Sequence, residues 1–339
     1  MHEIDLSKYK IRTDLIIEQL DNSINQVLRE YKDIKVLDIS LDKDNNEINK
    51  LKGRYITISF NDVTDINNES NLEKVFISEL RALLKSLHIK DDYKCLVVGL
   101  GNTNSTPDSL GPKVINNVLV TRHLFELDGI KVEKGYRNVA AFTPGVMGST
   151  GIEASDVILG IIDKIKPDFI LVIDALASSS IDRVNKTIQM TDSGINPGSG
   201  VGNSRKELSK RTLGIPVIAI GVPTVVDAVT IVSDTINYIK KNYSYNIRNI
   251  DKPSNKLKLA KDINYLEEDI ELSSEDRKKL LGLVGNLNDK DMKKLIFEVL
   301  TPVGYNMMVT PKEVDFVIDK LSLLLTRGIN KSLHSNKTN

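Results

Sequence analysis

Apolar-rich segments and amphipathic segments alternate through the middle of this chain. Short apolar runs predict buried β-strands at 54–60, 94–98, 168–176 and 215–222. Apolar residues at helical spacing predict helices at 71–89, near 112–125, near 152–165 and at 224–241. Such alternation is typical of a parallel-rich sheet that is covered by helices on both faces. We therefore predict an α/β core over residues 54–241.

The segments outside this core are more polar. Residues 1–53 contain a weakly amphipathic helical stretch near 14–30 and form a predicted appendage before the core. Inside the core, 178–214 is a long polar excursion with a β-like stretch, "RVNKTIQMTD", and loops of such length are usually functional or interfacial. Residues 242–275 are charged, which favours a linker or insertion. Helical spacing near 273–285, 289–300 and 310–333 predicts a helical C-terminal segment, 276–339, packed on the core.

Composition narrows the class of protein. The 339 residues include 46 Lys and Arg against 46 Asp and Glu, so no net field attracts the chain to nucleic acid or to an anionic membrane. The single cysteine, Cys95, cannot form an internal disulfide, which favours a reducing compartment. The N-terminus lacks the apolar run of a signal peptide, and no long apolar run suggests a membrane span. We expect a cytoplasmic protein that binds neither nucleic acid nor membrane.

The loop after the predicted strand 94–98 has the sequence "GLGNTNSTPDSLGP" and carries one acid, Asp108. A second acid, Asp174, ends the apolar run "FILVID". Ligands and catalytic groups of open α/β sheets collect at the carboxyl ends of the strands. Each acid alone could equally be a helix cap or a turn residue. Together they suggest a carboxylate pair in which crowding raises one pKa, so that one acts as base and the other as acid.

Other catalytic arrangements fit the sequence less well. The four histidines, His2, His88, His123 and His334, lack metal-ligand spacing to one another or to the cysteine, so we expect neither a metal nor a cofactor. No nucleophile-elbow sequence is present for a serine triad. "GLGN" fails the dinucleotide-binding pattern because Asn104 stands where a glycine is required. "TDSG" at 191–194 lies in the polar excursion, which favours a turn.

Several longer motifs resemble those of the germination protease family of spore-forming Firmicutes. They are "GLGNTNSTPDSLGP", "TRHLFEL", "FTPGVMGSTGIEASDVI", the stretch from "KPDFILVIDALASSS" to "GVPTVVDAV", and "VTPKEVDFVID". The resemblance extends over nearly the whole chain. It implies an endopeptidase that degrades small acid-soluble spore proteins during germination, works as a homotetramer in the forespore or spore core, and has a core similar to that of hydrogenase maturation peptidases.

The resemblance also assigns roles to residues. The two catalytic aspartates of the family lie in motifs that here contain Asp108 and Asp174. The glycines of the loop, Gly99, Gly101 and Gly111, allow sharp turns and close approach, while Asn102 holds the loop by hydrogen bonds. The family is made as a zymogen that removes a short propeptide by self-cleavage. We place that propeptide at 1–14, with the cut between Asp14 and Leu15, in "RTDLII".

Two other classes of function stay open on the sequence alone. One is a nickel-assisted maturation peptidase that acts on a single partner protein, although no histidine can be placed on the third loop that such a site would use. The other is a non-catalytic or nucleotide-binding α/β module. The segment "RTDL" also has a purely structural interpretation, in which Thr13 or Asp14 caps a helix.

Overall fold

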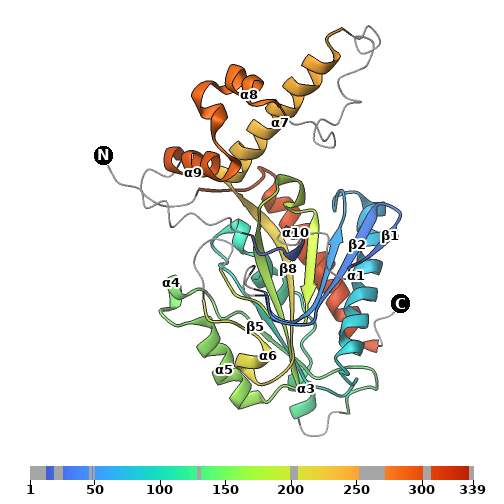
Figure 1. The fold of residues 1–339 in the computed structure, drawn as a ribbon. Helices are drawn as coiled ribbons and strands as arrows, with labels where there is room; N and C mark the ends of the chain where they lie inside the picture. Colours follow the sequence, from blue (N-terminus) through green and yellow to red (C-terminus); the bar gives the residue numbers. More distant parts are fainter. Residues whose placement is uncertain are drawn as a thin grey trace. The chain divides into compact units, whose positions relative to one another are not determined.

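The computed structural model describes residues 13–18, 26–45, 48, 50–127, 131–198, 205–251, 272–300 and 307–335 (Figure 1). The chain divides into two compact units. The larger comprises Arg12–Val226 and Thr310–Asn339, and the smaller comprises Met1–Ile11 and Asp227–Val309. Each unit is described by itself below.

The larger unit is built on a mixed sheet with strand order β1-β2-β3-β7-β8-β6-β4-β5. The strands are β1 Gln26–Tyr31, β2 Ile34–Leu41, β3 Gly53–Ser59, β4 Cys95–Gly99, β5 Val139–Phe142, β6 Phe169–Ser178, β7 Thr187–Thr191 and β8 Val217–Asp227. The pairs β4–β5, β4–β6 and β6–β8 are parallel, whereas β1–β2, β2–β3, β3–β7 and β7–β8 are antiparallel. The predicted α/β class with parallel strands is confirmed, and the antiparallel half makes the sheet mixed.

Helices cover both faces of the parallel half. The helices of this unit are α1 Ile66–Ser86, α2 Leu110–Ile115, α3 Arg122–Glu126, α4 Met147–Thr150, α5 Ala154–Ile165, α6 Lys210–Leu213 and α10 Val314–Leu333. One core cluster joins α1, α2 and α10 to side chains such as Val97, Leu171 and Ile220. The other joins α5 and α6 to Val98 and Val172 on the opposite face. Period-two alternation along buried strands therefore supplies both cores.

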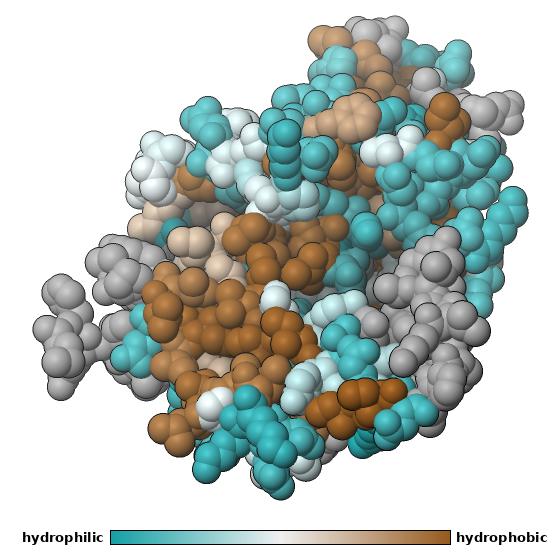
Figure 2. Space-filling view, turned by 90° about the horizontal axis from the view of Figure 1, so that it is seen from above, coloured by the Kyte–Doolittle hydropathy of each residue, from teal (hydrophilic) through white to brown (hydrophobic). Residues whose placement is uncertain are grey.

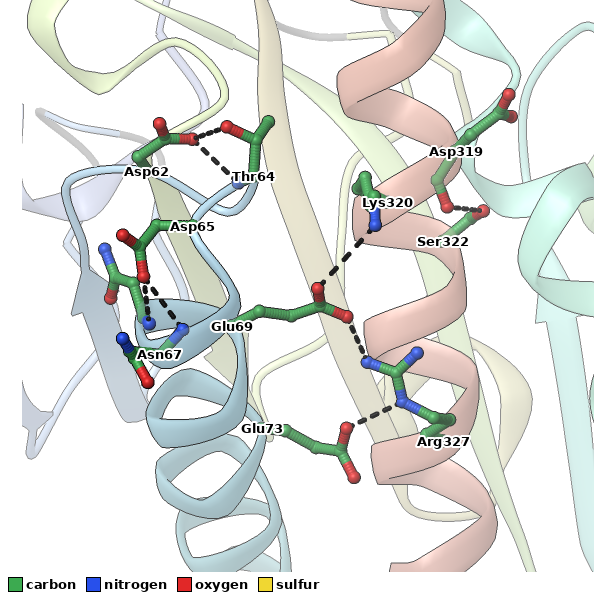
Figure 3. Close-up of polar contacts among 11 residues, drawn as sticks. Asp62, Thr64, Asp65, Asn67, Glu69, Glu73, Asp319, Lys320, Ser322 and Arg327 are labelled. Carbon is green, nitrogen blue, oxygen red and sulfur yellow. Dashed lines mark hydrogen bonds and ion pairs between the residues drawn. The ribbon is translucent and has the colours of Figure 1, made fainter.

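Helices α1 and α10 lie side by side and are joined by ion pairs (Figure 3). The Arg327 guanidinium lies 2.5 Å from Glu69 and 2.7 Å from Glu73 on α1. Asp65 caps α1 by accepting hydrogen bonds from the backbone of Asn67 at 2.8 Å and Asn68 at 3.0 Å. These contacts and the apolar seam beneath them hold α10, although it is the last helix in the chain, against the first long helix.

Residues 26–31 form strand β1, so the helical stretch predicted near 14–30 is wrong there. The described start of that stretch is a 3₁₀ turn at Ile16–Glu18. Strand β1 lies at the sheet edge, and most of its side chains are exposed. An exposed edge strand needs no alternation of apolar and polar residues, so the pattern that identifies buried strands is absent from it. Its pairing with β2 places both strands in the sheet.

The smaller unit contains α7 Ala228–Asn249, α8 Ser274–Leu281, a 3₁₀ turn at Gly282–Asn286, α9 Asp289–Leu300 and β9 Met308–Val309. Helix α7 begins where the Asp227 carboxylate accepts a hydrogen bond from the Val229 backbone N–H at 2.8 Å. Its apolar face packs with α9 through Val229, Met292 and Phe297. The helices predicted at 224–241, 273–285 and 289–300 are therefore present with shifted ends, as is usual for helix boundaries.

Apolar side chains also reach the surface of the molecule. In Figure 2, brown atoms gather into a broad area on the face seen from above. The exposed large apolar residues of the smaller unit are Tyr238, Ile239, Ile247, Ile250, Leu283, Val284, Val299 and Met307. Contiguous exposed apolar surface is typical of sites where proteins bind other molecules.

Candidate active site

Asp174 lies on β6, the strand between β4 and β8, and is almost fully buried. The strand register pairs Asp174 with Gly221 on β8, Gly221 with Gln189 on β7, and Gln189 with Thr57 on β3. Residues paired directly across a sheet present their side chains on the same face. Asp174 and Gln189 therefore lie on one face, separated by a single glycine that has no side chain.

Asp108 is held at the same end of the sheet by the loop that follows β4. It ends a 3₁₀ turn at Thr106–Asp108. At the loop's start, the Leu100 backbone N–H donates to the Ile173 carbonyl at 2.8 Å, one residue before Asp174. At its end, the Thr224 hydroxyl donates to the Pro107 carbonyl at 2.7 Å. The loop is thus tied to both β6 and β8, and Asp108 lies beside the strand ends as the sequence predicts.

Two glycines allow the loop to fold this tightly. Gly101 adopts a φ of +116°, and a Cβ atom there would lie 2.0 Å from the Asp108 carbonyl oxygen. A Cβ atom on Gly111 would lie 2.2 Å from the Leu100 carbonyl oxygen. The Asn102 backbone N–H donates to that same Asp108 carbonyl at 3.0 Å, and the Asn102 side chain accepts from Asn104 N–H at 3.0 Å. Any larger residue at either glycine would push the loop off the strand ends.

The two carboxyl groups have different proton affinities. Burial raises the pKa of Asp108 to about 6, and a hydrogen bond from the Asn102 backbone opposes the rise. Burial, and then the nearby charges of Asp108 and Asp14, raise the pKa of Asp174 well above its ordinary value. Both carboxyls therefore hold a proton more strongly than an ordinary aspartate, and Asp174 has the additional effect of the two neighbouring acids. Such a pair can remove a proton from water with one member and donate a proton with the other.

The described N-terminal segment, residues 13–18, lies along the end of β6. The Asp14 backbone N–H donates to the Ala177 carbonyl at 3.0 Å, and the Ala177 N–H donates to Asp14 Oδ2 at 2.9 Å. The Ile16 N–H donates to Gln189 Oε1 at 2.8 Å. The side chains of Leu15 and Ile16 are fully buried. The structure thus brings Asp14 and Leu15, which the sequence analysis placed at a cleavage site, to the same region as Asp174.

Glu18 anchors this segment. Its carboxylate accepts hydrogen bonds from the Ser178 hydroxyl at 2.5 Å, the Ser179 N–H at 2.7 Å and the Ser179 hydroxyl at 2.8 Å. It also lies 3.0 Å from the Arg183 guanidinium, and only 3% of its side chain is exposed. A buried carboxylate with so many donors is held firmly, which fixes the segment downstream of Leu15.

Lys50 and Gln189 contact the main chain of Asp14. Lys50 Nζ donates to the Asp14 carbonyl oxygen at 2.7 Å, and Gln189 Nε2 donates to the same oxygen at 3.2 Å. Burial lowers the pKa of Lys50, while the charges of Asp14 and Glu18 oppose the decrease. Sequence reasoning did not identify Glu18, Lys50 or Gln189. The only available signal was Gln189, a polar residue between Ile188 and Met190 in the β-like stretch.

Two further observations concern the reactive side chains of the described residues. Cys95 is buried in β4, and burial raises the pKa of its thiol far above the usual range, so it is not a reactive thiolate. Within the ranges that the structure describes, no group of three or more His, Cys, Asp or Glu side chains could hold a metal ion. In those same ranges, every helix is too short or too polar to cross a bilayer.

Comparison with known proteins gives a consistent match along the chain. The family model described as germination protease matches residues 8–339. The germination protease of Priestia megaterium is 48% identical over 355 residues, which cover 98% of this chain and 96% of the relative. That of Bacillus cytotoxicus is 48% identical over 351 residues, 98% of this chain and 95% of the relative.

Among solved structures, a NiFe hydrogenase maturation protease from Thermococcus kodakarensis aligns with a TM-score of 0.28 and 19% identity. The alignment covers 43% of this chain and 80% of that one.

Proposed function

This chain belongs to the germination protease family, and on that premise we propose that it hydrolyses peptide bonds with Asp108 and Asp174 as its catalytic pair. The observation that carries the proposal is the position of two carboxyls at the ends of the neighbouring strands β4 and β6, where burial raises the pKa of both. Both acids were also selected by the position of strand ends in the sequence, independently of the family.

In the proposed reaction the ionised Asp108 takes a proton from water. The water oxygen forms a bond to the carbonyl carbon of the substrate, and Asp174 donates its proton to the leaving nitrogen as the carbon–nitrogen bond breaks. Asp108 ends protonated and Asp174 ionised, so one proton moves between them before the next cycle. The Asn102 backbone, whose effect on Asp108 is to lower its pKa, helps to keep Asp108 the stronger acid of the two.

The substrates that we propose are small acid-soluble spore proteins, cleaved in the forespore or spore core during germination. We further propose that the chain is made as a zymogen whose propeptide, 1–14, is removed by a cut between Asp14 and Leu15, and that it assembles as a homotetramer. The support for the cleavage position is the contact of Asp14 with Ala177, close to Asp174. The support for assembly is the exposed apolar surface.

The test replaces each acid separately. Asp108→Asn and Asp174→Asn should each reduce cleavage of a purified small acid-soluble spore protein by at least about a hundredfold, because each removes half of the acid–base pair. Cleavage products are measured by mass spectrometry. The matched control is Asp182→Asn, an exposed aspartate on the 3₁₀ turn Ile181–Arg183, which should leave the rate unchanged. Wild-type rates in either dyad variant would remove that residue from the mechanism.

A further inference from the structure

The carbonyl oxygen of Asp14 accepts hydrogen bonds from two side chains that come from different parts of the sheet. Lys50, before β3, lies at 2.7 Å, and Gln189, on β7, lies at 3.2 Å. If the chain is cut after Asp14, this oxygen belongs to the carbonyl group whose carbon–nitrogen bond breaks. We propose that Lys50 and Gln189 form the oxyanion-binding site of this protease. The inference rests on the proposed function and deepens it.

The strand register supports the placement. Gln189 and Asp174 lie in one row on one face of the sheet, with Gly221 between them. Neighbouring strands are about 4.8 Å apart, so the backbones of Gln189 and Asp174 are separated by about 10 Å across β8. The Leu176 side chain covers Gly221, where an added Cβ would lie 2.5 Å from Leu176 Cδ1. Because Gln189 Nε2 donates to the Asp14 carbonyl oxygen, that oxygen lies on the face of the sheet that also carries Asp174.

The same contacts define what precedes the cleaved bond. The Ala177 N–H donates to the Asp14 carboxylate at 2.9 Å, while the Asp14 N–H donates to the Ala177 carbonyl at 3.0 Å. This pair fixes both the register of the peptide and an acidic side chain immediately before the cut. After the cut site, Leu15 and Ile16 are fully buried. The segment therefore places an acidic residue before the proposed cut and two buried aliphatic residues after it.

Lys50 and Gln189 can stabilise the negative charge that the reaction creates on the carbonyl oxygen. When the water oxygen attacks, the carbonyl double bond opens and negative charge collects on the carbonyl oxygen, which then loses it again when the bond to nitrogen breaks. Donors already aimed at that oxygen bind it more strongly in the transition state than in the ground state. Partial burial of Lys50 strengthens this interaction because surrounding water competes less for the charge.

The experiment uses the full-length chain and follows its own cut between Asp14 and Leu15 by intact mass. Lys50→Met removes one donor and keeps the length of the side chain. Gln189→Glu removes the other donor while keeping the Oε atom that accepts from Ile16 N–H. Each should slow the cut by about 10²–10³-fold. Lys50→Arg keeps a donor at this position, so its rate should be close to that of the wild type and well above that of Lys50→Met. The control is Lys52→Met, because Lys52 is exposed and lies two residues away; its rate should match the wild type.

A second measurement distinguishes a role of Lys50 and Gln189 in catalysis from a role in holding residues 13–18 in place. Hydrogen exchange at the amides of Asp14 and Ile16 reports whether the segment stays in place, since both amides are hydrogen-bonded here. Slow cutting with unchanged protection supports the proposal. Wild-type rates in both donor variants, or slow cutting only where protection is lost, overturn it while leaving the proposed function intact. A wild-type chain that is not cut after Asp14, in conditions where it degrades a spore protein, overturns the inference alone. A wild-type chain that cuts neither overturns both.

Discussion

At the scale of single residues, the decisive feature is the buried carboxyl group of Asp174, whose favourable contacts do not offset the cost of burial. The hydrogen bond that Asp174 Oδ1 accepts within its own strand, from the Ala175 N–H at 2.9 Å, is outweighed by burial and by the charges of Asp108 and Asp14. Ionisation of Asp174 is therefore costly while these neighbouring charges are present. Departure of Asp14 would remove one of these charges and lower the pKa of Asp174, while burial and Asp108 would still raise it.

This arrangement predicts how stability depends on pH. The folded chain raises the pKa of Asp108 from 3.8 to about 6, so it favours the protonated form. That contribution is complete below about pH 4 and is lost as the pH rises through about 6. Asp108→Asn cannot ionise, and it should raise the free energy of unfolding at pH 8 by about 1–3 kcal/mol relative to wild type.

The measurement is urea denaturation of the uncut chain at pH 4 and pH 8. The gain should disappear at pH 4, and Asp174→Asn should show the same sign because its pKa is also raised. A destabilised Asp108→Asn at pH 8 would mean that the ionised carboxylate has a stabilising partner that the contacts described above do not include.

The sequence predicted the two acids and missed the groups around them for a physical reason. Asp108 and Asp174 each follow an apolar strand, and the strand fixes where its end lies. Glu18, Lys50 and Gln189 come from a 3₁₀ turn, a bridge before β3 and an antiparallel strand. Their meeting at one point depends on strand order, which no local pattern encodes. Whether Asp108 and Asp174 are catalytic stays a prediction.

At the scale of elements, the loop between β4 and α2 owes its shape to glycine. The loop must leave β4, bond to β6 and β8, and return to begin α2 within about ten residues. It does so by packing its own backbone at distances that no side chain tolerates. The local geometry around Asp108 is therefore set by residues that carry no reactive group.

A single methyl group should be enough to disturb this loop. Gly101→Ala places Cβ 2.0 Å from the Asp108 carbonyl and forces alanine into a φ of +116°. Backbone strain of this kind costs about 1–3 kcal/mol before the clash is counted, so we expect a lower melting temperature and loss of cleavage together. Gly160→Ala on α5 is the matched control, because nothing lies within 4 Å of the added atom.

In that control the substitution should raise stability by about 0.5–1 kcal/mol, since alanine favours a helix interior over glycine. Calorimetry and the spore-protein assay report the two effects. Full activity in Gly101→Ala would show that the loop can relax without moving Asp108.

The elements that the sequence predicted best are those with strong periodicity. Strands β4, β6 and β8 and helices α1, α5 and α10 lie where apolar spacing predicts them. Strands β1, β2 and β5 were not predicted: β1 is exposed, and β5 has only four residues with one fully buried side chain. The predicted helix near 112–125 divides into α2 and α3.

At the scale of the whole molecule, the chain divides at Asp227, which caps α7. The amphipathic pattern of 224–241 predicts a helix correctly. An apolar face in the sequence does not indicate which hydrophobic core the helix packs into. Here that face packs with α9 within the smaller unit. The helix α10 lies on the main sheet with α1, so the larger unit joins the first long helix to a helix from the far end of the described chain.

The seating of residues 13–18 against β6 of the same chain has a consequence for reaction order. A segment bound to its own molecule is cut in a first-order process, whose half-time does not depend on how many copies are present. We expect the half-time of the cut after Asp14 to stay constant when the chain is diluted a hundredfold, as followed by quenched time points and intact mass. A half-time that lengthens in proportion to dilution would mean that one molecule cuts another. With first-order cutting, the time between the folding of a chain and its cleavage does not depend on the concentration of the protein in the compartment.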